Sequence, residues 1–155
     1  MELIRRFSAE AWAAALQDWA WLPGLTGARP LVASSFGDAF LQGPDGVWFL
    51  DVAEGTLTRE WDDVPALEAA LNTRAGQDRF LLAGLAVAAA AAGMEPAGDQ
   101  ILCWKTPPIL GGDLSLANVE IGDLAVSLSL AGQLHRQVKD LPPGAHIGSV
   151  TVVDA

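Results

Sequence analysis

The amino-acid sequence predicts a single α+β domain: an antiparallel sheet with an N-terminal helix and an alanine-rich central helix. Short runs rich in Val, Phe, Trp, Leu and Thr, separated by turn residues, fill residues 31–61 and are typical of antiparallel strands. Before them, Trp12, Leu16 and Trp19 recur at helical spacing. After them, the apolar run at residues 80–93 is shorter than the roughly 20 residues of a membrane span and favours a buried helix.

The first helix is expected to begin at Ala9. Ser8 is a good N-cap, because its hydroxyl can accept a hydrogen bond from a free backbone N–H of the first turn. Pro23 and Gly24 should end the element. We therefore treat residues 1–35 as an N-terminal helical part.

The following segment predicts a three-stranded antiparallel meander. The turn at residues 43–46, Gly-Pro-Asp-Gly, should join strands at residues 38–41 and 47–51. Glu54 and Gly55 make a second turn, which leads to a strand at residues 56–61.

Two helices are predicted next. Asp62, Asp63 and Pro65 favour a short helix that contains Leu67 and Leu71. Asp78 should open the central helix and Gly93 should close it. Within that helix Gly84, Ala88 and Ala92 form a stripe of small residues, which would let another element pack closely.

The last third of the sequence is expected to contain further strands and a short helix. Residues 99–104 predict a strand, followed by a loop stiffened by Pro107 and Pro108. Alternating apolar residues predict strands at residues 119–121 and 124–130, offset at Gly122 and Asp123. Residues 133–139 predict a helix that stops at residues 142–144, and residues 149–153 a last strand.

Composition restricts the class of protein. The 155 residues are 51% hydrophobic and carry a net charge of −10, which argues against direct binding to nucleic acid. A single cysteine, Cys103, excludes an internal disulfide framework and suits a reducing cytosol. Residues 1–19 lack a clean signal-peptide core, so we expect a cytoplasmic protein without a membrane span.

The stretch CWKTPPILGGD, residues 103–113, raises the question of catalysis. Cys103 would need a base such as His135 or His146 to act as a nucleophile, although a cysteine inside an apolar strand is more often part of the core. Lys105 with Gly111 and Gly112 does not match a phosphate-binding loop. Metal-ligand spacing is missing as well, so we expect no cofactor, no metal and no enzymatic activity.

Acidic residues are concentrated in the meander. Residues 38–68 hold eight acids and one base, Arg59. Solvated strand edges and helix caps account for several of them, and an acidic face for a basic partner is the other interpretation. The candidate partner-binding residues are Asp38, Asp45, Asp51, Glu54, Glu60, Asp62 and Asp63, together with Lys105 and Asp113 of the loop.

Residues 36–144 resemble the C-terminal domain of the bacterial type VI secretion immunity protein family, long described as a domain of unknown function. The resemblance rests on Lys105 with Pro107-Pro108 and Leu110-Gly111-Gly112, on Asn118-Val119-Glu120, and on Gly132-Gln133 with His135 and Gln137. Many members carry a GAD-like region before this domain, and residues 1–35 are short for a complete one.

The resemblance implies a binding protein. Characterised members of that family bind secreted DNase toxins and neutralise them in the cytoplasm of the producing cell, so a basic nuclease is the implied partner. Three alternatives stay open from the residues themselves: a scaffold or regulatory module with another protein partner, a small enzyme that uses Cys103 and a histidine, and self-association into a homodimer.

Overall fold

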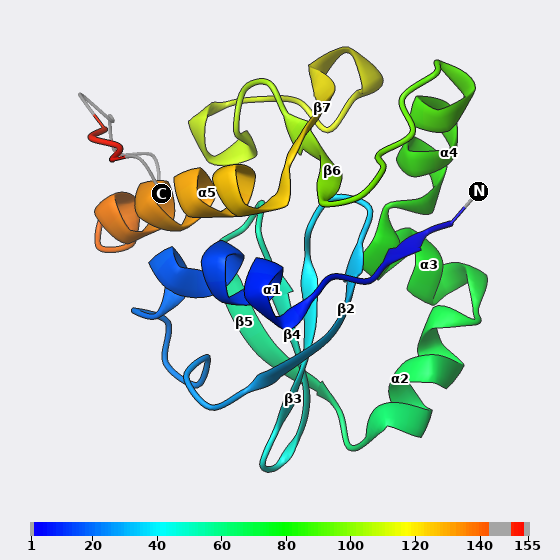
Figure 1. The fold of residues 1–155 in the computed structure, drawn as a ribbon, viewed down its shortest axis with the longest axis vertical. Helices are drawn as coiled ribbons and strands as arrows, with labels where there is room; N and C mark the ends of the chain where they lie inside the picture. Colours follow the sequence, from blue (N-terminus) through cyan, green and yellow to red (C-terminus); the bar gives the residue numbers. More distant parts are fainter. Residues whose placement is uncertain (1, 143–149, 154–155) are drawn as a thin grey trace.

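The computed structural model of the protein describes residues 2–142 and 150–153, and it shows a single α+β domain with two antiparallel sheets (Figure 1). The larger sheet contains, in spatial order, β1 (Ile4–Arg5), β2 (Arg29–Ser34), β3 (Ala39–Gly43), β4 (Gly46–Asp51) and β5 (Thr56–Trp61). The smaller sheet pairs β6 (Gln100–Trp104) with β7 (Val119–Asp123).

The predicted meander is present as β3, β4 and β5. Gly43 pairs with Gly46 across the first turn, where Gly46 has a φ of 150° and a Cβ would lie 2.5 Å from the carbonyl oxygen of Trp61. Only glycine fits there. The N-terminal part is not only helical, however, because β1 and β2 extend the same sheet to five strands.

Each face of the larger sheet is covered by helices, which follows from the alternation of side chains along a strand. Phe40 and Phe49 point to one face, where they pack with Trp61 and Phe80. On the other face, Leu41 and Leu50 pack with Trp12, Trp19 and their neighbours. The sheet is therefore a buried layer between two apolar clusters.

The N-terminal helical segment lies against the long last helix, α5 (Leu124–Val138), as Figure 1 shows. It consists of α1 (Ala9–Leu16), capped by Ser8 as predicted, and the 3₁₀ turn η1 (Gln17–Trp19). The indole of Trp19 donates to the carbonyl of Leu128 at 2.8 Å. Gly132 permits the close approach, because a Cβ there would lie 2.7 Å from the carbonyl oxygen of Asp18.

The second and third helical regions differ from the prediction. α2 (Val64–Leu71) is capped by Asp63 as expected, but the next helix, α3 (Arg74–Leu81), begins after Thr73 rather than at Asp78. Leu82 is left-handed, with a φ of 48°, and separates α3 from α4 (Ala83–Ala91). The break sends Leu81 into the core under the large sheet and Leu82 toward the smaller sheet.

The expected small-residue stripe and the central place of the alanine-rich helix are wrong. α4 lies at the periphery of the molecule (Figure 1) and buries Ala86 and Ala89, whereas Gly84 and Ala92 are exposed. These two alanines pack with Leu102 and Val119 of the smaller sheet.

Residues 124–130 form the start of a helix and not the predicted strand. Asp123 caps this helix, because its carboxylate accepts from the backbone N–H of Val126 at 3.0 Å. Leu124 and Leu128 are one helical turn apart and both fully buried. Residues 133–139 thus continue α5, and the bulge expected at Gly122 and Asp123 is the junction of β7 with this helix.

Residues 150–153 lie beside α5 and are not a strand, which corrects the last predicted element. Three predicted features fall wholly or partly outside the described residues: the candidate base His146, the helix stop at Pro143-Gly144, and Ser149 at the start of the last predicted strand.

Candidate functional site

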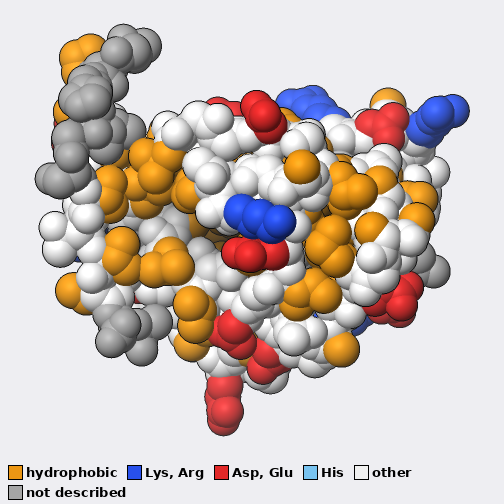
Figure 2. Space-filling model, turned by 90° about the horizontal axis from the view of Figure 1, so that it is seen from above, with side chains coloured by type: hydrophobic (Ala, Val, Ile, Leu, Met, Phe, Trp, Pro, Cys, Tyr) orange, Lys and Arg blue, Asp and Glu red, His pale blue; other side chains and the backbone are white. Residues whose placement is uncertain are grey.

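A groove of about 570 Å³ lies between α5 and the smaller sheet, and it is the best-formed candidate for a partner site. Its floor includes Ile101 and Leu128, and one wall is formed by Val126 and Leu130 of α5. Figure 2 looks onto this side of the molecule and shows exposed apolar side chains with charged groups between them. Val126 and Leu130 are 52% and 44% exposed, so their apolar surface is open to a partner.

The opposite wall is the loop that follows β6. Pro107, Pro108 and Leu110 line the groove, and the 3₁₀ turn η2 (Pro108–Leu110) ends at Gly111 with a φ of 96°. The side chain of Asn118 holds the loop, because it accepts from Thr106 N at 2.8 Å and donates to Thr106 O at 2.8 Å. Asn118 also donates to the carbonyl of Asp113 at 3.0 Å. The stretch is therefore a loop between β6 and β7, as predicted, and the hydrogen bonds of Asn118 fix its two ends relative to each other.

Lys105 and Asp113, the two loop residues predicted to bind a partner, are placed differently. Both side chains are exposed, but Lys105 lines the groove whereas Asp113 does not. Glu120 and Asp123 line it from β7. The groove thus has an apolar centre with charged residues around it, which is the usual anatomy of a protein-binding surface.

Cys103 lies half-buried in the same groove, on β6. Burial raises the pKa of its thiol, with a smaller contribution from the nearby Glu120 carboxylate. A reactive cysteine needs the opposite shift, because the thiolate is the nucleophile. His135 also lines the groove, but its Nε2 is bonded to the carbonyl of Val52 at 3.0 Å.

Asp38 corrects the predicted acidic face. It is buried, with 6% of its surface exposed, and accepts hydrogen bonds from Ser34 Oγ at 2.9 Å and from Val52 N at 2.9 Å. Burial, and secondarily the charge of Asp51, raises the pKa of Asp38 to about 7. This residue stabilises the turn between β2 and β3 and is closed to a partner.

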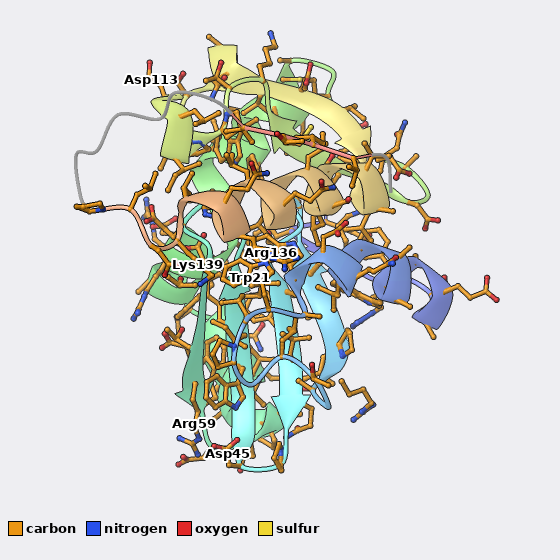
Figure 3. The ribbon with its side chains drawn as sticks, turned by 90° about the vertical axis from the view of Figure 1, so that its left-hand side faces the viewer. Trp21, Asp45, Arg59, Asp113, Arg136 and Lys139 are labelled. Atoms are coloured by element: carbon orange, nitrogen blue, oxygen red, sulfur yellow. The ribbon has the colours of Figure 1, made fainter. Side chains whose placement is uncertain are left out.

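The other acids do not form one face, because a meander places successive turns at opposite ends of the sheet. Asp45 and Asp62 lie at one end, where both approach Arg59, with Asp62 Oδ1 at 2.8 Å from Arg59 Nη2. Figure 3 shows Asp45 and Arg59 far from Asp113. Asp63 is exposed at the same end, as the cap of α2.

Asp51 and Glu54 lie at the opposite end, in the turn between β4 and β5. Asp51 accepts from the backbone N–H of Glu54 at 3.0 Å, and both carboxylates favour the charged form of the nearby His135. Glu60, on β5, pairs with Arg79 of α3 at 3.6 Å and is only partly exposed. Of the predicted acids, Glu54 is therefore the exposed one nearest the groove, next to Ala53 in its lining.

Sequence reasoning missed the outward-facing stripe of α5, which we define as Val126, Leu130 and Gln137, all exposed, together with the half-buried Gln133. These residues lie three and four apart and so share one face of the helix. The sequence contains this helical spacing, but the alternation of apolar residues at 124–130 pointed to a strand instead. The two glutamines hold residues 150–153 against the helix.

A second hollow, of about 510 Å³, lies between α1 and residues 25–30. Within residues 2–142 and 150–153, no strongly exposed large apolar side chain lines it. The same residues contain no cluster of three or more potential metal ligands and no helix long and apolar enough to cross a membrane.

Comparison with known proteins supports the fold. No family model matches the sequence, and no curated protein does. The crystal structure of Atu4351 from Agrobacterium tumefaciens is similar, with a TM-score of 0.59 and 16% sequence identity. The match covers 84% of this chain and 66% of that chain, slightly less than two thirds. At this identity the likeness establishes a shared α+β fold and leaves the function to other arguments.

Proposed function

We propose that this chain is a non-enzymatic protein-binding module, and specifically an immunity protein that binds and neutralises a type VI secreted DNase toxin in the cytoplasm. The observation that carries the binding role is the apolar groove with two exposed walls. Val126 and Leu130 on α5 face solvent, as does Leu110, 43% exposed, on the loop. Exposed apolar groups on both sides of one groove favour a protein partner.

The toxin is the more specific part of the proposal. It is supported by the resemblance of the loop and α5 to the type VI immunity family, since these motifs are the elements that build the groove. The net charge of −10 favours a basic partner such as a nuclease. A scaffold that binds another protein through the same groove is the second candidate, and it rests on the same exposed apolar walls.

A toxin-inhibition assay tests the proposal. If a nuclease toxin is encoded beside its gene, the purified chain should form a stoichiometric complex with that nuclease and should stop it from cleaving DNA. Val126→Asp should weaken the complex at least about tenfold, because a carboxylate would be desolvated at the interface. Val87→Asp is the matched control, since Val87 is 53% exposed on α4 and outside the groove.

The outcomes separate the candidates. Stable binding to a protein that is not a nuclease would replace the toxin with a scaffold partner. Equal binding of the toxin by Val126→Asp and Val87→Asp would place the interface elsewhere.

A further inference from the structure

Gln133 and Gln137 each bind one residue of the chain's own extended segment through a pair of hydrogen bonds. Gln133 Oε1 accepts from Val153 N at 2.8 Å, and its Nε2 donates to Val153 O at 2.9 Å. Gln137 treats Thr151 in the same way, accepting from its N–H at 2.8 Å and donating to its carbonyl. Only backbone atoms of the segment take part, so this contact does not depend on side-chain identity.

The spacing of the two glutamines suits an extended chain. Residues four apart on a helix are separated by about 6 Å along its axis. Residues two apart in an extended segment are separated by about 6.5 Å. Two amides at this helical spacing therefore meet alternate residues of an extended peptide, and only a non-proline residue can supply the N–H that each amide accepts.

Residues 150–153, the segment bound by the two glutamines, lie at the surface of the protein. Val152 and Val153 are 47% and 64% exposed, although Val152 also lines the groove. The segment runs opposite to α5, since Thr151 meets Gln137 and Val153 meets Gln133. A longer occupant with the same direction would next pass Leu130 and Val126, whose apolar side chains are exposed.

We propose that Gln133 and Gln137 form a clamp for the backbone of an extended segment of a partner protein, and that residues 150–153 occupy the clamp when the partner is absent. The partner segment has N–H groups at the two clamped positions and apolar side chains where it passes Leu130 and Val126. This inference rests on the proposed use of the groove for protein binding and adds the form of the ligand and an internal competitor for it.

Competition determines the expected result. A tethered segment competes at an effective concentration of the order of millimolar, so it lowers the apparent affinity for a separate peptide. Release of residues 150–153 should therefore increase that affinity without any change in the clamp itself.

A peptide-binding measurement on the full chain tests whether release of residues 150–153 increases the affinity for a separate peptide. The probe is a fluorescently labelled peptide, SVTVVDA, which has the sequence of residues 149–155. Thr151→Pro combined with Val153→Pro removes both N–H donors from the internal segment, and the matched variant Thr151→Val with Val153→Ala retains them. We expect the proline variant to bind the probe about tenfold more tightly than the matched variant.

Three further arms identify the clamp. In the proline variant, Gln133→Leu with Gln137→Leu should return the affinity to the low value, whereas Gln17→Leu, at an exposed glutamine of η1, should not. A probe methylated at the two backbone nitrogens that correspond to Thr151 and Val153 should fail to bind. Equal probe binding by the proline variant and its matched variant, or retained binding after the double leucine substitution, would overturn the inference.

The probe comes from the chain itself, so the result does not depend on the identity of the partner. Failure of the clamp would leave toxin binding through the groove possible, and failure to find a toxin would leave the clamp intact.

Discussion

Asp38 and His135, which are far apart in the sequence, bond the two backbone polar groups of Val52. The carboxylate of Asp38 accepts from Val52 N at 2.9 Å, and Nε2 of His135 lies 3.0 Å from Val52 O. Because a carbonyl oxygen only accepts, Nε2 must carry the proton. The end of β4 is thus fixed between the turn that follows β2 and the last helix, at one end of the groove.

The buried carboxyl of Asp38 predicts a particular dependence of stability on pH. Its pKa is raised from 3.8 to about 7, so between these values the folded state binds more protons than the unfolded state. The free energy of unfolding should therefore fall as pH rises through this window, by at most about 1.4 kcal/mol per pH unit from this group. The penalty is absent below pH 3.8 and complete above about pH 7.

Asp38→Asn should remove this dependence, because an amide retains an oxygen for Val52 N and carries no charge. Urea unfolding between pH 4.5 and 8 measures it. His135 acts in the opposite direction, since burial lowers its pKa from 6.5 and its contribution to stability is lost as pH falls. The contribution of His135 is the same in the unsubstituted protein and in Asp38→Asn, so the difference between their two stability–pH profiles isolates Asp38. Parallel profiles would contradict the prediction.

Asn118 should control the order of the loop that forms one wall of the groove. Asn118→Ala removes three hydrogen bonds to Thr106 and Asp113 and should lower the free energy of unfolding by about 1 to 2 kcal/mol. Hydrogen exchange at the amide of Thr106 should become faster. Asn72→Ala, at an exposed residue beyond α2, is the control. Unchanged exchange at Thr106 would show that the loop is held by other contacts.

The sequence predicts the parts of the fold whose chemistry is local. The turn at Gly46 and the caps at Ser8 and Asp63 use residues within a few positions of each other, and the structure confirms all three. Leu82 could not be predicted in the same way. Its left-handed backbone lets two adjacent leucines enter different apolar clusters, which is a tertiary requirement that helix propensity does not contain.

The candidate site was predicted only in part, because it too depends on contacts between residues that are distant in the sequence. Lys105 was identified from its loop and does line the groove. Asp38 is buried rather than exposed, and the sequence pattern does not contain this difference, because one of its hydrogen-bond partners, Val52, lies beyond the end of β4 and meets Asp38 only in the folded chain. The clamp on α5 needed the helix to be recognised first, and the period-2 alternation pointed to a strand.

Charge reversal should change the rate of association with the partner differently at the two acidic ends of the sheet. The acidic residues were expected to act together, yet Glu54 lies beside the groove whereas Asp62 lies at the far end, paired with Arg59. If the groove receives a basic partner, Glu54→Lys should slow association roughly two- to fivefold at low salt, because exposed charges near an interface mainly affect the rate of encounter. Asp62→Lys should have a smaller effect. Stopped-flow association with the toxin at two ionic strengths measures both. Equal rates for the two variants would reject electrostatic guidance toward the groove, and a larger effect at Asp62 would move the partner to the opposite end of the sheet.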